Sequence, residues 1–472
     1  METRVHAFVD DALGRDDATG VAERIRSGEI SAAEAIEAAI ARIERVEPQL
    51  GAVQRDDFER ARAASKRREG GALAGVFGGV PAALKDNLTT RGRGMTLGSD
   101  AVSDHPRSID GDYAKQLYAT GMIPVATSTM PPFGWTASTE RPGDRVTRNP
   151  WDLERSAGGS SGGSAALVAA GAVPIAHGND GGGSIRIPAA ACGLVGLKPT
   201  RGRHLGDPRT DGLPVAIVSG GVLTRSVRDT AALHAALEET YRNPKLQPIG
   251  EVKGAGARRL RVGVVIDSPL GPPSDGPTRA ALEASADLLD SLGHQVEPHD
   301  SPTPRSFKTD FEDYWAFLAF MVHRTGPKRM GEGFDASRLD PLTLGLSAQA
   351  ARRLHRMPLA IARLRASGRA YERSLGALDV VMSPVVAHTT PQIGYLGADL
   401  PYETHLERLR AYACFTPLHN AAGAPAISLP LGESPEGMPI GVMFAARRGA
   451  ERILLELAYE LEAAAPFARI DP

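Results

Sequence analysis

Two segments rich in glycine and serine carry the residue types that acyl transfer requires. Residues 158–164 read GGSSGGS and residues 180–184 read DGGGS, and each segment precedes a stretch that we predict to be helical. Ser160 and Ser184 lie 24 residues apart. Successive backbone N–H groups in such loops can stabilise an anion. A serine hydroxyl beside several of these amides combines a nucleophile with an oxyanion hole, so we predict acyl transfer here.

A serine nucleophile also needs a base, and the sequence offers few choices. His177, seven residues before Ser184, is the one histidine close to the second segment. Lysine is rare, since only eight of the 54 basic residues are lysines, which makes each of them individually interesting. Lys85 follows the short apolar run 80–84, which we predict to be a strand. The residue types alone leave the base unassigned.

Other known catalytic and cofactor-binding motifs are either absent from the sequence or lack the structural context that they need. Residues 158–162 match G-x-S-x-G, but a nucleophile elbow needs a strand just before it, and residues 155–159 are typical of a loop. The chain has no Gly-Lys dipeptide for a P-loop, no G-x-G-x-x-G after a strand and no H-E-x-x-H. We therefore expect neither a cofactor nor a metal.

Composition and charge narrow the class of protein. The chain is 42% hydrophobic and 23% charged, with 54 basic and 56 acidic residues and a formal net charge of −2, which does not favour nucleic-acid binding. The two cysteines, Cys192 and Cys414, cannot make a disulfide framework. No apolar run reaches 18 residues, and the acidic N-terminus lacks the apolar core of a signal peptide. We expect a cytoplasmic protein without a membrane or nucleic-acid partner.

The elements that must position these residues alternate between helix and strand, which is typical of the α/β class. Ser31-Ala-Ala-Glu34 is a capping box, and the apolar spacing after it predicts a helix that ends at Pro48. The HGNDGGGS run at 177–184 is predicted to be a loop. We predict further strands at 122–126, 173–176, 260–266, 380–382, 426–429 and 440–444, and further helices at 226–237 and 278–292.

We predict one domain over residues 1–472. Residues 301–375 form a helix-rich insertion with an aromatic cluster, which we expect to cover the substrate pocket.

Residues 158–201 resemble the signature of the amidase signature family, and Pro81-Ala-Ala-Leu-Lys-Asp-Asn-Leu88 resembles its lysine motif. The likeness extends from about residue 19 to 465 and includes APAISLP at 424–430 and GMPIGV at 437–442. It implies the family's fold, a large mixed twisted β-sheet flanked by helices on both faces.

The resemblance also assigns roles to individual residues. It implies that Ser184 is the nucleophile, that Ser160, on a cis peptide bond, is a bridging serine and that Lys85 is the general base. It further implies an oxyanion hole made by the amides of Gly181, Gly182, Gly183 and Ser184. Asp180 and Arg186 are similar to the family's pair that fixes this loop.

Two departures from the family pattern bear on the substrate. Gly181 stands where many members have Ile or Thr, which we expect to loosen the oxyanion loop. Residues 127–133 read TSTMPPF in place of a common K-T-N-x-P-E-F, and the missing acid predicts a more apolar pocket. The residues that we expect to line this pocket are Met130, Phe133, Trp135, Trp315, Phe317 and Phe320.

Within the family, HGND and KPTRGR are similar to 6-aminohexanoate cyclic-dimer hydrolases, and the branch also resembles aryl acylamidases and urethane-cleaving amidases. This implies hydrolysis of uncharged secondary amides, linear, cyclic or aryl, and of carbamates, by a monomer or homodimer acting on small molecules. Two alternatives stay open. One is a glutaminase subunit that supplies ammonia to a partner, and the other is a catalytically inactive binding module, against which the intact Lys85, Ser160 and Ser184 argue.

Overall fold

The computed structural model describes residues 4–68, 74–207, 210, 212–304, 306–331 and 333–471, so the predicted domain of 1–472 and its region 301–375 are described apart from these gaps. The strands are β1 (Val53–Asp56), β2 (Pro81–Lys85), β3 (Ile123–Ser128), β4 (Glu140–Arg141), β5 (Arg145–Val146), β6 (Arg148–Asn149), β7 (Asp152–Ser156), β8 (Ile175–Asp180), β9 (Val195–Lys198), β10 (Ser219–Thr224), β11 (Arg261–Val264), β12 (Gln295–Pro298), β13 (Val380–Pro384), β14 (Ala426–Glu433) and β15 (Pro439–Ala446).

Helices make up most of the remaining regular structure. They are α1 (Ala18–Ser27), α2 (Ala32–Leu50), α3 (Phe58–Arg68), α4 (Asp112–Ala119), α5 (Gly162–Ala169), α6 (Arg186–Cys192), α7 (Val227–Thr240), α8 (Gly276–Ser291), α9 (Phe307–Arg329), α10 (Pro341–Arg353), α11 (Met357–Ser374), α12 (Tyr402–Tyr412), α13 (Pro417–Ala422) and α14 (Glu451–Ala464), with short 3-10 turns at Pro132–Gly134, Ala336–Arg338 and Leu354–Arg356.

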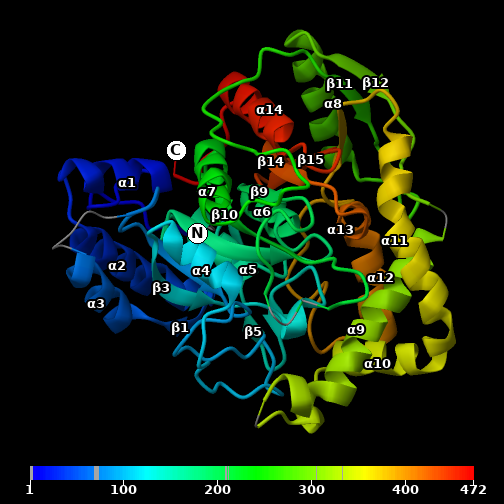
Figure 1. Cartoon of the computed structure of the whole chain (residues 1–472), viewed down its shortest axis with the longest axis horizontal. Helices are drawn as coiled ribbons and strands as arrows, with labels where there is room; N and C mark the ends of the chain where they lie inside the picture. Colours follow the sequence, from blue (N-terminus) through cyan, green and yellow to red (C-terminus); the bar gives the residue numbers. More distant parts are fainter. Residues whose placement is uncertain are drawn as a thin grey trace.

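A single mixed sheet forms the centre of the molecule (Figure 1). Among the described residues it has eleven strands in the order β1-β3-β2-β8-β10-β9-β14-β15-β13-β11-β12. The β2–β3, β2–β8, β11–β12 and β11–β13 pairs are parallel, and the other neighbours are antiparallel. The predicted α/β class and large mixed sheet are confirmed.

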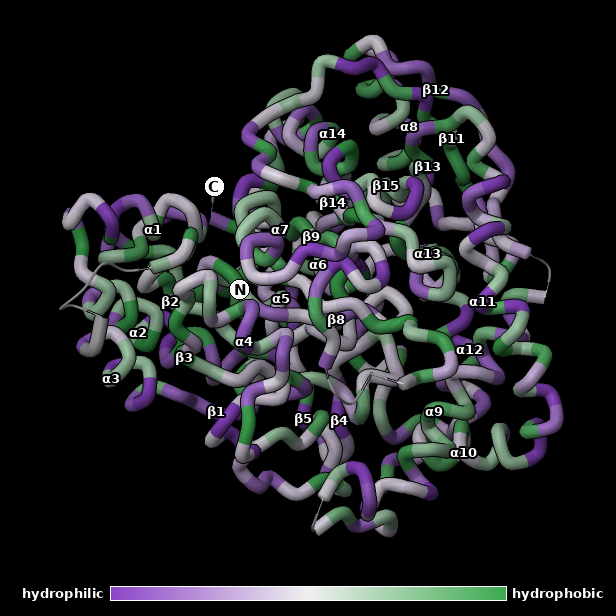
Figure 2. The backbone as a smooth tube through the Cα atoms, viewed as in Figure 1, coloured by the Kyte–Doolittle hydropathy of each residue, from purple (hydrophilic) through white to green (hydrophobic). Residues whose placement is uncertain are grey.

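Helices cover both faces of the sheet, as the packing of β15 illustrates. Side chains alternate between the two faces of a strand. Val442 and Phe444 join a core cluster with residues of α8 and α14, whereas Met443 and Ala445 join another with residues of α6. The strand is therefore apolar along its whole length because it is buried on both sides. Hydrophobic and hydrophilic residues alternate instead along many of the outer helices (Figure 2).

The sheet register brings the two predicted catalytic segments together. β2 and β8 run parallel, with Ala82 opposite Ile175 and Ala83 opposite Ala176. Parallel neighbours end at the same edge of a sheet. Lys85 at the end of β2 and Asp180 at the end of β8 therefore lie at one edge, and the loop 181–185 leads from there into α6.

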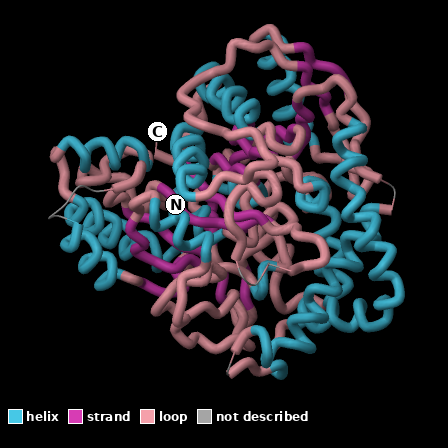
Figure 3. The backbone as a smooth tube through the Cα atoms, in the orientation of Figure 1, coloured by secondary structure: helices cyan, strands magenta, loops and turns pink. Residues whose placement is uncertain are grey.

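Helices α9 to α12 form a group on one side of the sheet, at the right in Figures 1 and 3. Trp135 packs with Ala316 and Ala319 of α9 and with Leu342 and Leu346 of α10 in one buried apolar cluster. The helix-rich region predicted for 301–375 is thus built of α9, α10 and α11. No helix within the described ranges is both long enough and apolar enough to span a bilayer.

Three local predictions were wrong. Arg155 and Ser156, predicted to begin a loop, are the last two residues of β7. Residues 177–180, the first half of the run predicted as a loop, are the last four residues of β8, where His177 pairs with Val222 and Asn179 with Gly220 of β10. Pairing with a neighbouring strand outweighs the turn propensity of Gly, Asn and Asp, a tertiary effect that the local sequence does not encode. Pro48 does not end its helix either: α2 continues to Leu50 and closes at Gly51, whose φ is +58°.

Candidate active site

A cleft with a mostly apolar lining opens beside the loop 181–185 and encloses about 830 Å³, counting the space at its mouth. Gly182 and Ser184 lie in one wall, and residues of α9 and α12 form much of the rest. The predicted nucleophile therefore borders a space that can hold a small molecule, which is a frequent property of enzyme sites. Its lining residues include Trp135, Phe311, Trp315, Lys308, Glu312, Arg410 and Cys414.

Lys85 is buried behind this wall and contacts three side chains. Its Nζ lies 2.8 Å from Ser160 Oγ, 2.9 Å from Ser161 Oγ and 2.7 Å from Asn179 Oδ1. Only 1% of the residue is exposed. Burial lowers the pKa of the Lys85 amine well below its usual 10.5, and the charge of Asp180 opposes this only in part. The Gly159–Ser160 peptide bond is cis.

The partners of Lys85 determine which way its lone pair points when the amine is neutral. A neutral amine has two N–H donors and one lone pair. Asn179 Oδ1 can only accept, and the Ser161 hydroxyl donates to the backbone oxygen of Ser184, 2.5 Å away. Both therefore take an N–H from Lys85, and the lone pair is left for the Ser160 hydroxyl. This geometry suits a base that takes a proton from Ser160.

Asp180 and Arg186 form a fully buried pair that holds the loop between them. Both side chains are 0% exposed, and Arg186 Nε and Nη2 each lie 2.9 Å from a carboxylate oxygen of Asp180. Asn420 of α13 donates to Asp180 and accepts from Arg186. Burial alone would raise the pKa of the Asp180 carboxyl, but Arg186 and Asn420 keep it well below its usual value.

The four amides predicted for an oxyanion hole are not equivalent. The Gly183 N–H donates to Asp180 Oδ1 at 2.7 Å, so it already has a partner. Gly183 has φ +133° and a Cβ there would lie 2.4 Å from Thr416 Oγ1, so this position requires glycine. We therefore centre the proposed hole on Gly181, Gly182 and Ser184, with Gly183 fixing the turn.

Gly181 and Gly182 lie close to aromatic side chains of α9. A methyl group on Gly181 would lie 3.4 Å from Val218 and 3.8 Å from the Trp315 ring, and one on Gly182 would lie 3.9 Å from Phe311. The aromatic side chains of α9 thus lie against the glycines. These distances are ordinary van der Waals contacts, so a methyl group would fit at either glycine, and the expected loosening of the loop stays a prediction.

Only two of the six predicted pocket residues line the cleft. Trp135 and Trp315 do so, and their rings meet edge to face at a centroid distance of 5.0 Å. The other four are not among its lining residues. Phe317 packs near Tyr314, Phe320 lies under Arg324, Phe133 joins an apolar cluster with Met95 and Leu97, and Met130 approaches Gly134.

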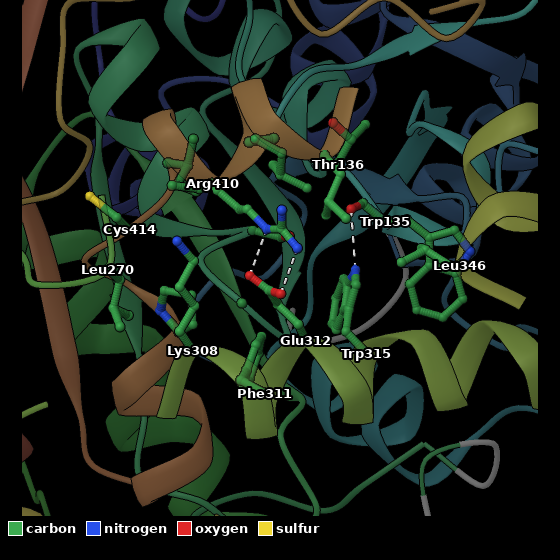
Figure 4. A pocket seen from close by; sticks show the side chains of 18 of the residues that line it. Trp135, Thr136, Leu270, Lys308, Phe311, Glu312, Trp315, Leu346, Arg410 and Cys414 are labelled. Carbon is green, nitrogen blue, oxygen red and sulfur yellow. Dashed lines mark hydrogen bonds and ion pairs between the residues drawn. The ribbon is translucent and has the colours of Figure 1, made fainter. Parts of the chain in front are cut away.

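Sequence reasoning missed a charged group in the cleft. Glu312 and Arg410 form a two-point ion pair, with both N···O distances 2.7 Å, and Lys308 lies beside them (Figure 4). The prediction of an apolar pocket therefore holds only for the part around Trp135, Phe311 and Trp315. Helical spacing of 308, 311, 312 and 315 could have placed these residues on one face. Asn179 and Ser161, the other partners of Lys85, were also missed.

Metal ligation has little support at this site. Within the described ranges, no cluster of three or more His, Cys, Asp or Glu side chains is arranged to hold a metal ion. Cys414 lines the cleft, and burial raises the pKa of its thiol to about 12, which keeps it protonated. The titratable groups best placed to act at the loop are therefore Lys85 and the serines.

Replacing Arg186 by Met should destabilise the protein by about 3–5 kcal/mol, because it leaves the buried Asp180 carboxylate without its charged partner. Urea unfolding followed by circular dichroism measures this change. The matched control is Arg145→Met, which breaks the half-exposed pair with Asp100 and should cost far less. Equal losses in the two variants would contradict the role given to Arg186.

Comparison with known proteins agrees with these features. The family model described as Amidase matches residues 34–455. The chain is 49% identical over 469 residues to the Mycobacterium tuberculosis protein named "Putative amidase AmiC", covering 99% of this chain and 98% of that one. It is 37% identical to the 6-aminohexanoate-cyclic-dimer hydrolase of Paenarthrobacter ureafaciens, covering 97% and 96%. A solved structure of 6-aminohexanoate cyclic dimer hydrolase superposes with a TM-score of 0.84 at 34% identity, covering 97% and 98%. The chain belongs to the amidase signature family and is a hydrolase of carbon–nitrogen bonds in amides.

Proposed function

We propose that the protein cleaves secondary amides through an acyl-enzyme on Ser184, with Ser160 and Lys85 as the proton relay. The observation that carries this proposal is the contact of a buried lysine with Ser160, directly behind the cleft wall that contains Ser184. Burial favours the neutral amine, which is the form that can accept a proton. A serine hydroxyl needs such a base to attack an amide.

The proposed reaction has two steps, acylation of Ser184 and hydrolysis of the acyl-enzyme. Ser184 Oγ attacks the carbonyl carbon, its proton passes to Ser160, and the Ser160 proton passes to Lys85 Nζ. The amides of Gly181, Gly182 and Ser184 stabilise the oxyanion. The C–N bond then breaks as Ser160 protonates the leaving amine and recovers a proton from Lys85. A water molecule then attacks the acyl ester and passes its proton through Ser160 to Lys85. The ester C–O bond breaks, the acid is released, and Ser184 Oγ recovers a proton through the same relay.

The walls nearest the loop favour a neutral, bulky group at the scissile bond. Trp135, Phe311 and Trp315 present aromatic surface there, which binds anilides, cyclic amides and arylcarbamates better than a small zwitterion. With a carbamate, the intermediate is a carbamoyl or carbonate ester on Ser184. The similarity to 6-aminohexanoate-cyclic-dimer hydrolases points in the same direction. The alternative, a glutaminase subunit, would have to bind the charged α-amino and α-carboxyl groups of glutamine.

A substrate panel tests the substrate class. The purified chain alone should hydrolyse p-nitroacetanilide or an arylcarbamate with a kcat/KM about 10²-fold above that for glutamine, which is about 3 kcal/mol in transition-state binding. Released nitroaniline and ammonia report the two activities. Glutamine as the best substrate, or a requirement for a second protein, would reject this substrate class in favour of the glutaminase alternative.

The proposed base predicts a pH profile. Only neutral Lys85 accepts a proton, so kcat/KM should rise with pH through the lowered pKa of Lys85 and level off above it. Asn179→Asp should move this rise to higher pH, because a carboxylate in place of Oδ1, now 2.7 Å from Nζ, favours the ammonium form. Asn179→Ser is the matched control and should show no alkaline shift. A wild-type profile that is flat down to about pH 5 would point to another base.

A further inference from the structure

Three charged side chains line the cleft together with its aromatic residues. Glu312 and Arg410 hold each other through two contacts of 2.7 Å, and their side chains are 17% and 35% exposed. Lys308 lines the same cleft and forms no ion pair with any residue that the structure describes. The two cations and one anion leave one unbalanced positive charge in this part of the cleft. Nothing in the proposed reaction uses it.

Helix α9 sets the separation between this charge and the reacting loop. Lys308, Glu312 and Trp315 are three or four residues apart, so they share one face of the helix. Trp315 marks the end next to the loop, because a methyl group on Gly181 would lie 3.8 Å from its ring. At a rise of 1.5 Å per residue, Lys308 lies roughly 10 Å further along the helix axis.

Aromatic rings line the interval between the two ends, together with the Glu312–Arg410 pair (Figure 4). Phe311 stacks on Trp315 at a centroid distance of 5.9 Å and lies one turn from Lys308. Figure 4 shows Lys308, Phe311, Glu312 and Trp315 projecting from the same side of α9 into the pocket. A ligand that reaches from the loop to Lys308 therefore passes these rings and the mutually neutralising Glu312–Arg410 pair before it meets the charge of Lys308 (Figure 4).

The positive charge at the Lys308 end of the cleft favours an anionic ligand group over a cationic one. Glu312 engages Nε and Nη2 of Arg410, so the Arg410 guanidinium and the Lys308 ammonium both keep N–H donors for an anion. An ammonium group of a substrate would enter a region with net positive charge. A carboxylate instead gains charge-assisted hydrogen bonds.

We propose that this end of the cleft is a carboxylate subsite, formed by Lys308 with Arg410. The preferred substrates are then amides that are uncharged around the scissile bond and carry a carboxylate at the far end of an apolar spacer. The inference rests on the proposed function, because it places the scissile bond at Ser184, and it narrows the substrate class of that same site.

The test uses matched pairs of p-nitroanilides. One member of each pair is the monoanilide of a dicarboxylic acid, from glutaric to sebacic, and the other is its methyl ester. For the best spacer length, the wild-type enzyme should prefer the acid about tenfold in kcat/KM. The preference should weaken as salt is added, since Lys308 is exposed. The acid-to-ester ratio is taken within one preparation, so it does not depend on the fraction of active enzyme.

Variants of Lys308 locate the subsite. Lys308→Met should bring the acid-to-ester ratio close to one, and Lys308→Glu should invert it and favour the matching ω-amino acyl anilide. The control variant Lys115→Met removes an exposed lysine that pairs with Asp112 on α4, away from the cleft, and should keep the wild-type ratio.

The outcomes separate this inference from the proposed function. Hydrolysis of the esters without any preference for the acids, or a preference for ω-amino acyl anilides in the wild type, would overturn the carboxylate subsite and leave the proposed function intact. Failure to hydrolyse any anilide of either kind would overturn both. An acid preference that survives in Lys308→Glu would show that Lys308 does not form the subsite.

Discussion

Replacing Ser184 by Ala should lower kcat by at least about 10⁴-fold, because the variant lacks the oxygen that forms the acyl-enzyme. The side chain is only 9% exposed and lies in the cleft wall, so removing one oxygen should change the free energy of unfolding by no more than about 1 kcal/mol. Steady-state hydrolysis of an anilide and urea unfolding measure the two effects.

A nearby serine provides the matched control. Ser164 is also buried, and its hydroxyl contacts Ser128 Oγ and the backbone oxygen of His177, both at 2.7 Å. Ser164→Ala should therefore reduce stability more than turnover. If Ser184→Ala kept a kcat within a few-fold of wild type, Ser184 would not be the nucleophile.

Removing the proposed base should have an effect of similar size. Lys85→Met and Ser160→Ala should each lower kcat by roughly 10³-fold or more, and the double variant should lose little beyond the larger single effect. Residues that pass one proton in sequence act as a unit, so their effects do not add. Stopped assays of product release at several pH values make this comparison.

The control for Lys85 is another buried lysine. Lys198 is fully buried, its Nζ donates to the Pro199 carbonyl, and burial together with Arg186 lowers its pKa to about 7. Lys198→Met should retain turnover within about tenfold. If the losses in Lys85→Met and Ser160→Ala multiplied in the double variant, the two residues would act independently, contrary to the relay.

Much of the fold followed from local patterns. The capping box at Ser31 begins α2, Ser226 caps α7, and the apolar runs 80–84 and 440–444 are strands. These signals lie within a few residues of each other in the chain, so local physics suffices to identify them. Family membership could likewise be inferred because the two signature segments are short and specific.

Other features depend on contacts between distant segments. The HGND run becomes part of β8 only because β10, some 40 residues later, pairs with it. The cleft combines Trp135 with Trp315 of α9 and Arg410 of α12. Which aromatic residues of 311–320 face this cleft is set by the orientation of α9 against the sheet. Hydrophobic spacing alone could not distinguish Phe311 and Trp315, which line the cleft, from Phe317 and Phe320, which do not.

The most direct test of the central claim is to locate the covalent intermediate. Incubation with p-nitrophenyl hexylcarbamate, followed by intact-protein and peptide mass spectrometry, should reveal one hexylcarbamoyl group per chain, on the peptide that contains Ser184. The adduct should be missing from Ser184→Ala and should form more slowly in Lys85→Met. An adduct on Cys414, which lines the same cleft, or unchanged labelling of Ser184→Ala, would contradict the assignment of Ser184 as the nucleophile.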